Sequence, residues 1–346
     1  MKISAIIADS LYNPETGYYL TKNPIGSEND FITAPEISQI FGEVMAIYLL
    51  HIAQNFNEKI ALVEMGAGRG VWFYDILFTI HKLAQNNAKI AIDFLQKTNF
   101  NIIEINRELT KIQQQKLKNY KINWFQNFAE FENNNSLPIL FISNELFDCF
   151  PIDQYVKTQN GWQEKLVHSD DKQNLSKGRF VIRNFDEEIH RFVMEKIGED
   201  EANKAKIGAV FEHNEMAQNL MNLLCLAIKK RGGILINFDY GYNFYEFANT
   251  LQVLKNHQKI DFFQGLKKAD ITALVDFTAL DKIAKKQQLK TSLISQREFI
   301  LNLNGSERLQ NLIKENPWQK EDLTHRFNRL IDPKQMGELF KVMIIW

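Results

Sequence analysis

The stretch Leu62-Val63-Glu64-Met65-Gly66-Ala67-Gly68-Arg69-Gly70 decides the fold of this 346-residue chain. An apolar run from Ile60 to Val63 leads into an acid and three glycines at alternate positions, and residues 71–77 then have the apolar spacing of a helix start. A strand, a glycine turn and a helix in this order form the ligand-binding corner of open α/β sheets. Glycine lets a ligand touch the main chain, and the helix N-terminus offers free N–H groups.

The details of the turn indicate which ligand it binds. A dinucleotide fingerprint would need glycine at position 71, where the chain has Val71. The pattern E-x-G-x-G-x-G instead resembles the first motif of class I S-adenosylmethionine (SAM) methyltransferases. The expected cofactor-binding residues here are Glu64, Gly66, Ala67, Gly68 and Gly70. Glu64 is expected to engage the ammonium group of SAM. For this stretch alone, a purely structural turn stays the alternative.

Composition excludes several classes of protein. Lys and Arg number 41 and Asp and Glu 42, so the formal charge of −1 argues against broad electrostatic binding to nucleic acid or anionic lipid. The 2 cysteines and 7 histidines show no metal-ligand spacing, so neither a metal site nor a disulfide framework is expected. The longest apolar runs are too short to span a bilayer, and the first residues make a poor signal peptide. A reducing cytoplasm fits this composition.

Apolar periodicity predicts the order of the elements. Strands are expected at 60–64, 101–105, 122–125, 138–142, 234–238, 291–294 and 339–345, and helices at 71–85, 88–97, 109–117, 214–231, 276–288 and 297–331. This alternation, with its late strand pair, predicts a Rossmann-like α/β fold with a seven-stranded, mostly parallel sheet. Asn160-Gly161 predicts a tight hairpin. We therefore expect a core of residues 59–155 and 207–346, with insertions at 156–206 and 243–270 that form a substrate-side subdomain.

Residues 1–58 are expected to form a lid or cap beside the cofactor. Residues 9–35 look irregular, and Thr33 is the expected N-cap of a helix that has Pro35 and Glu36 in its first turn. Together with Asp30, these three residues form the candidate lid. A packing extension is an equally good explanation of the segment.

Polar side chains follow three of the predicted strands. Glu104 closes the second strand, where an acid accepts hydrogen bonds from ribose hydroxyls, and Ile105 is expected beside it at the cofactor. The fourth strand ends in the run Asn144, Glu145 and Asp148, which should lie near the reactive methyl group because the carboxyl ends of the strands face the ligand. The fifth strand ends in Asp239-Tyr240, a second pair of candidates.

Several further stretches carry a family resemblance. The chain resembles the MidA-like methyltransferases, which include a mitochondrial protein-arginine methyltransferase of complex I assembly. The matching stretches are 11–19, 30–38 with 41–43, the glycine turn, 144–148 with Pro151 and Gln154, 239–242, 250–251 with His257, 270–272 with 275–277, and 336–340. The chain has Asn29 and Leu274 at two positions where the family usually has glycine and histidine.

The resemblance implies a class I methyltransferase fold, SAM as cofactor and a protein arginine as methyl acceptor. In the mitochondrial relative this arginine lies on the 49-kDa-type subunit of NADH:quinone oxidoreductase, and a bacterial, cytoplasmic counterpart is expected here. Glu145 and Asp148 would grip the guanidinium and Asn144 would position it, with Asp239 and Tyr240 as further candidates. A helix-capping role for Asp148 and a turn role for Asp239 are equally good explanations of these two acids. Two other functions stay open, namely an assembly chaperone without catalysis and methylation of a small molecule.

Overall fold

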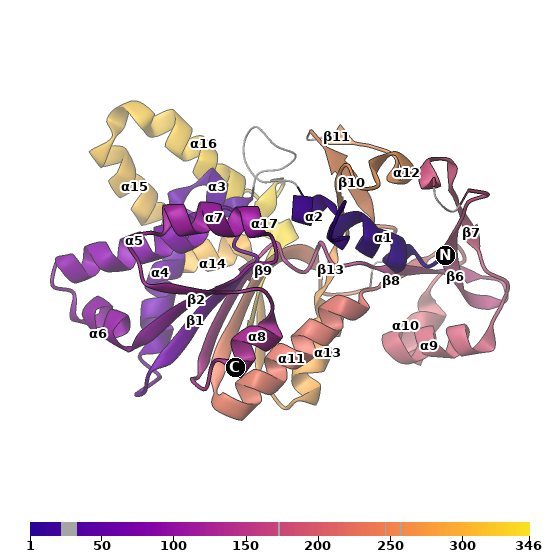
Figure 1. Ribbon diagram of the computed structural model, residues 1–346, viewed down its shortest axis with the longest axis horizontal. Helices are drawn as coiled ribbons and strands as arrows, with labels where there is room; N and C mark the ends of the chain where they lie inside the picture. The colour runs from indigo at the N-terminus through magenta and orange to yellow at the C-terminus, as the bar shows by residue number, and fades with distance from the viewer. Residues whose placement is uncertain (22–32, 172–173, 246, 257) are drawn as a thin grey trace.

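The computed structural model describes residues 1–21, 33–171, 174–245, 247–256 and 258–346 (Figure 1). Its central sheet has the strand order β14-β15-β9-β4-β1-β2-β3, and β13 pairs with the end of β9. β15 runs antiparallel to β9 and β14, and the other neighbours are parallel. This confirms the predicted seven-stranded, mostly parallel sheet, to which the short strand β13 adds an eighth. The strands are β1 (Ile60–Met65), β2 (Thr98–Ile103), β3 (Ile122–Phe125), β4 (Ile139–Asn144), β9 (Gly233–Tyr242), β13 (Val275–Asp276), β14 (Thr291–Ser295) and β15 (Phe340–Ile345).

Helices cover both faces of this sheet (Figure 1). One face carries α4 (Gln39–Ala53), α5 (Val71–Gln85), α6 (Lys89–Lys97), α7 (Arg107–Lys116), α14 (Gln296–Asn302), α15 (Gly305–Glu315) and α16 (Lys320–Ile331). The other carries α8 (Phe128–Asn133), α11 (Glu215–Arg231) and α13 (Phe277–Lys286). Since both faces are covered, the inner strands β1 and β4 are almost wholly apolar and buried. The strand order reverses between β1 and β4, which is where open α/β sheets bind ligands.

Several predicted boundaries were wrong. The fifth strand, β9, continues to Tyr242, so Asp239 and Tyr240 lie inside the strand and not after it. The second strand ends at Ile103 instead of position 105, so Glu104 comes just after the strand. The expected helix over 297–331 is three helices, α14, α15 and α16, because Asn304 has a left-handed backbone (φ 58°) and Asn316-Pro317 begins a further turn. These breaks let the three helices fold back against α4, as their shared apolar cluster shows.

The N-terminal segment also differs from the prediction. Much of it is helical: α1 (Ile3–Tyr12) and α2 (Tyr18–Thr21) lie where 9–35 was expected to be irregular. Thr33 makes no side-chain capping bond, and α3 (Ala34–Ile37) stops at Ser38, whose backbone is extended. Thr33 is the N-cap position of α3, as predicted, and Ser38 caps the longer helix that follows: its hydroxyl accepts a hydrogen bond from the N–H of Ile40 and starts α4. The candidate lid residue Asp30 lies outside the described residues.

A second body is built from the inserted segments. A four-stranded sheet has the order β7-β6-β5-β8, and a three-stranded sheet has the order β11-β10-β12. The predicted hairpin at Asn160-Gly161 is confirmed as the turn between β5 and β6. The strands and helices of this second body are β5 (Asp153–Thr158), β6 (Gly161–His168), β7 (Arg179–Ile182), α9 (Glu187–Ile197), α10 (Glu199–Lys204), β8 (Val210–His213), β10 (Gln252–Lys255), β11 (Gln258–Lys259), α12 (Phe262–Gly265) and β12 (Asp270–Thr272).

The segment 1–58 is divided between the two bodies. Helix α1 buries Ile3, Ile7 and Leu11 against the inserted sheets, where Val253 and Ile271 join the same cluster. Helix α4 instead packs on the central sheet. The four-stranded sheet reaches from 153 to 213 and is therefore wider than the expected insertion at 156–206. Apolar residues of α1 thus join the inserted sheets into one cluster, which sits beside the central sheet (Figure 1).

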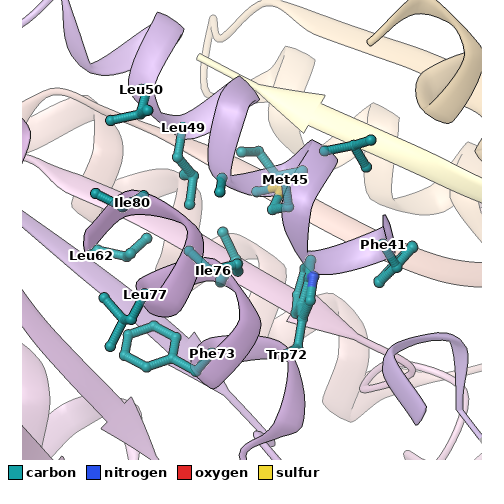
Figure 2. Packing of buried hydrophobic residues seen from close by; sticks show 14 of the residues in the cluster. Phe41, Met45, Leu49, Leu50, Leu62, Trp72, Phe73, Ile76, Leu77 and Ile80 are labelled. Atoms are coloured by element: carbon teal, nitrogen blue, oxygen red, sulfur yellow. The ribbon is translucent and has the colours of Figure 1, made fainter. Parts of the chain in front are cut away.

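The α4–α5 contact offers a test of the core. Figure 2 shows Ile76 of α5 between the two helices, close to Met45 of α4, and Ile76 is fully buried. We expect Ile76→Ala to lower the free energy of unfolding by about 2–5 kcal/mol, because it removes apolar contacts and leaves a cavity. Phe78→Ala, on the exposed side of the same helix, should cost less than about 1 kcal/mol. Urea unfolding of both variants measures the difference, and equal losses would contradict the packing.

Candidate active site

A cavity of about 800 Å³ lies at the carboxyl ends of β1, β2 and β4. Most residues that the sequence predicted for the site line it, namely Thr33, Pro35, Glu36, Glu64, Gly66, Ala67, Gly68, Glu104, Ile105, Asn144, Glu145, Asp148 and Tyr240. Gly70 and Asp239 do not line it. One cavity therefore joins the expected cofactor turn to the expected reactive edge.

The glycine turn forms one wall of the cavity. Gly66, Gly68 and Gly70 all have positive φ, at 74°, 54° and 70°, which side chains other than glycine rarely adopt. The N–H of Gly66 donates to the carbonyl of Ile103 at 2.9 Å, and a Cβ at Gly66 would stand 3.0 Å from Cδ1 of Leu146. Gly70 is the N-cap position of α5 and supports the turn from outside the cavity.

Two acids flank the turn at the ends of β1 and β2. Burial raises the pKa of Glu64 to about 8, and the carboxylate of Glu104 adds to the shift. Burial also raises the pKa of Glu104 to about 7, opposed by hydrogen bonds from the Asn106 N–H (2.9 Å) and the Gln113 amide (3.0 Å). The Gln113 amide also donates to the carbonyl of Gly68 at 2.8 Å and so ties the acid to the turn.

These residues fit the donor groups of SAM. Among the described residues, the Glu64 Oε2 and Asn144 Oδ1 atoms are buried without a hydrogen-bond partner. Such oxygens can accept hydrogen bonds from the ammonium group and the ribose hydroxyls of SAM. A positively charged ammonium beside a buried carboxyl group also lowers its pKa and favours the ionised carboxylate. The open backbone at Gly66 lets a ligand approach closely. Glu64 would hold the amino-acid end of SAM and Glu104 its ribose, beside the turn.

The buried Glu64 predicts a pH-dependent stability. An acid whose pKa is raised on folding binds more protons in the folded than in the unfolded state between its two pKa values. The unliganded protein should therefore lose stability as the pH rises from about 4.5 to about 8, with Glu64 contributing about 1.4 kcal/mol per pH unit. Glu64→Gln should flatten this slope in urea unfolding measured across that range. An unchanged slope would contradict the assignment of the titration to Glu64.

Glu145 occupies a strained position directly after β4. It has a left-handed backbone with φ 51°, unusual for glutamate, and its N–H donates to the carbonyl of Phe238 at 2.9 Å. Its Oε1 accepts from the Asn144 amide at 3.0 Å and from the N–H of Ala34 at 3.3 Å. Burial raises its pKa to about 8, with the Asp148 charge adding to the shift. With this backbone, Glu145 is one of the residues that line the cavity.

A wall of acids and tyrosines faces Glu145. Asp148, after β4, accepts a hydrogen bond from the Tyr240 hydroxyl, and burial raises its pKa to about 6. Asp270, at the start of β12, accepts one from the Tyr19 hydroxyl. All four side chains line the cavity. The inserted body and the N-terminal helices therefore complete a site whose floor belongs to the central sheet.

Sequence reasoning did not single out Tyr12, Tyr19, Gln113 or Asp270 as site residues. The tyrosines lie in or beside a stretch taken for a turn, and Asp270 is far from it along the chain. One signal was present for Gln113: it lies four residues from both Leu109 and Leu117, on the apolar side of α7, where a polar residue is unusual.

Asp239 has a position other than the expected one. It is fully buried, and its carboxylate accepts hydrogen bonds from the N–H groups of Leu146 (3.2 Å) and Phe147 (2.8 Å). It therefore holds the loop after Glu145 from the neighbouring strand and does not contact the cavity. Burial and the nearby charge of Asp148 raise its pKa well above the usual range.

The charge of the cavity favours a cationic ligand. The described lining residues include six carboxylates, from Glu36, Glu64, Glu104, Glu145, Asp148 and Asp270, and one basic side chain, Arg69. Arg69 pairs with Glu36 of α3 at 3.7 Å, which joins the candidate lid to the glycine turn. Among the described residues, no group of acids, histidines and cysteines could hold a metal ion.

Residues 44–295 match the model of a family described as "Putative S-adenosyl-L-methionine-dependent methyltransferase". The chain is 30% identical over 362 residues to "Protein arginine methyltransferase NDUFAF7, mitochondrial" of Danio rerio, covering 99% of this chain and 82% of that protein. The protein of the same name from Homo sapiens is 27% identical, with 98% and 78% covered.

A solved structure shares the fold. A COG1565 superfamily member from Burkholderia thailandensis, crystallised with S-adenosyl-homocysteine, matches with a TM-score of 0.83 and 24% identity over 100% of this chain and 87% of that one. A native crystal structure of a COG1565 superfamily protein from the same organism gives a TM-score of 0.80 at 23% identity over the same shares. Within the part of the chain that the structure describes, no helix is long and apolar enough to cross a membrane.

Proposed function

Because the chain belongs to this family of S-adenosyl-L-methionine-dependent methyltransferases, we propose that it methylates an arginine side chain of a protein. SAM supplies a methyl group already activated by a positively charged sulfur. The enzyme must then align the acceptor nitrogen and exclude water. The relatives named above are protein arginine methyltransferases, which supports the choice of acceptor.

One observation carries the proposal: three carboxylates converge on the same cavity as the glycine turn. Glu145 and Asp148 come from the end of β4, and Asp270 comes from the inserted body. A guanidinium stays protonated at neutral pH and presents N–H donors in a planar fork, which carboxylates bind in pairs. Tyr19 and Tyr240 hold two of the three acids by hydrogen bonds and so fix their orientation.

The raised pKa values suit the proton that the reaction releases. A guanidinium bound beside Glu145 favours its charged form, because an opposite charge within a few ångströms stabilises the carboxylate. When a methyl group is added, the cation must lose one proton. An acceptor whose pKa lies near neutrality, such as Glu145 at about 8 or Asp148 at about 6, can take it. Glu145 is our candidate for this role, and Asn144 fixes its carboxylate.

The methylated protein is proposed to be a subunit of NADH:quinone oxidoreductase, the 49-kDa-type subunit that the family resemblance indicates, with methylation aiding assembly of that complex. The inserted body beside the cavity gives a protein acceptor extra surface to dock on (Figure 1). The cytoplasmic location expected from composition stays a prediction, since the named relatives are mitochondrial.

The decisive experiment supplies labelled SAM to the purified chain together with that subunit, and maps the product by mass spectrometry. We expect methylarginine in the subunit, absent when the chain carries Glu145→Gln. Cells with and without the gene should differ in the same modification. A modification that persists without the gene, together with unimpaired binding of the subunit, would favour an assembly chaperone. Methyl transfer only to small cations would favour a small-molecule acceptor.

A further inference from the structure

A second cavity of about 540 Å³ adjoins the first. The two share Tyr240, Gln252 and Leu339 as lining residues, so these side chains form the partition between them. Leu339 is 45% exposed, which leaves the top of this partition open to solvent. A chain that places a side chain in the first cavity can therefore continue over Leu339 into the second.

The two cavities differ in charge. The first is lined by six carboxylates and one basic group, whereas the described residues of the second include two lysines, Lys165 of β6 and Lys259 of β11, and no acid. The rest of its lining is apolar or neutral, with Phe180, Val253 and Phe262 among its members. A ligand that spans both cavities should be cationic at one end and anionic at the other.

Lys165 is held in place without a described ion pair. Its ammonium donates to Oε1 of Gln154 at 2.7 Å and lies 4.2 Å from the centre of the Phe180 ring. Gln154 is itself fully buried, and its amide donates to Glu212 at 2.7 Å and to Asn249 at 2.6 Å. The charge of Glu212, on the other side of Gln154, favours the ammonium form of Lys165, but no ion pair between the two is described, so the ammonium can still bind a carboxylate of a ligand.

We propose that the second cavity binds the segment of the protein substrate beside the acceptor arginine, and that Lys165 and Lys259 recognise an acidic side chain there. This inference rests on the proposed arginine methylation and adds to it a sequence preference. The partition of Tyr240, Gln252 and Leu339 separates the site for the arginine from the site for its acidic neighbour.

Short peptides test the proposal directly. Each carries one arginine in a neutral background and a single glutamate, moved through every position on both sides, and a matched set carries glutamine instead. Calorimetry with the full chain and S-adenosylhomocysteine measures binding, and labelled SAM measures methyl transfer. We expect glutamate at one position to improve binding about tenfold over glutamine, the effect of one hydrogen bond between charged groups.

Variants assign the preference to the cavity. Lys165→Met and Lys259→Met should each reduce the glutamate preference, and Lys259→Glu, at an exposed position, should reverse it without disturbing the Gln154 network. Lys255→Met, an exposed lysine on neighbouring β10 outside both cavities, should keep the preference. Methylation with equal binding of the glutamate and glutamine peptides, or a preference that survives at all three variants of Lys165 and Lys259, would overturn the inference. Selective binding of acidic peptides without any methylation would instead overturn the proposed function.

Discussion

Glu145→Gln is expected to keep SAM binding and to slow methyl transfer by about a hundredfold to ten-thousandfold, the usual effect of removing a positioned acid–base group. The amide has the size of the carboxyl group and can still accept the hydrogen bonds from Ala34 and Asn144. It cannot carry the negative charge that binds a guanidinium, nor accept a proton near neutral pH. The substitution therefore removes chemistry with little change in shape.

Calorimetry with SAM and a methylation assay on the same preparation separate the two effects. Glu108→Gln is the matched control, because Glu108 lies on the surface of α7 in an exposed pair with Lys111. That variant should bind SAM and methylate like the parent. Full activity of Glu145→Gln would show that Glu145 is not the guanidinium clamp. Loss of SAM binding would show that it belongs to the cofactor site instead.

Gly66→Val is the second variant with a large expected effect. Its side chain would start 3.0 Å from Leu146, at the wall where we propose that the cofactor touches the backbone, and the backbone has φ 74°. We expect SAM binding to weaken by about a hundredfold or more, since forcing extra carbon atoms into a packed site costs up to about 3 kcal/mol. Equilibrium binding measured by calorimetry tests this directly.

Backbone strain alone must be separated from the blocked site. Gly208 also has positive φ (89°), and no described atom lies within 4 Å of a Cβ placed there. Gly208→Val should therefore lower the free energy of unfolding by about 1–2 kcal/mol, the penalty of a left-handed backbone, and leave SAM binding unchanged. If both variants lose affinity equally, the glycine turn is not the cofactor site. If neither does, the cofactor touches another wall.

The fold could be predicted because the apolar patterns that indicate its strands and helices lie in consecutive residues. The run at 60–63, the glycine turn and the apolar face of α5 lie side by side in sequence, and parallel strands buried on both faces read as unbroken apolar runs. The errors occur where a tertiary contact decides the local structure. The break at Ser38 is one example, since its extended backbone ends α3 and its hydroxyl caps α4.

The candidate site was predictable on one side only. Glu64, Glu104, Glu145 and Asp148 follow strands whose carboxyl ends must meet, so the topology places them together. Tyr19 and Asp270 are hydrogen-bonded but lie far apart in the sequence. They meet because the inserted body packs beside the central sheet, and this packing has no periodic pattern in the sequence that would predict it. Asp239, like Glu145, lies near the carboxyl end of a strand, where side chains are expected to face the ligand. The N–H groups of Leu146 and Phe147 instead donate hydrogen bonds to its carboxylate, which therefore holds that loop.

The place of β15 in the sheet sets the order in which the protein can be built. β9 lies between β4 and β15 in the sheet, but β15 is synthesised about a hundred residues after β9. Until it arrives, β9 presents an unpaired edge, including Tyr240, which pairs with Phe340. Such long-range closure slows folding and exposes intermediates to aggregation. The edge of β9 that carries Tyr240, part of the proposed acceptor site, is thus among the last parts of the sheet to be paired.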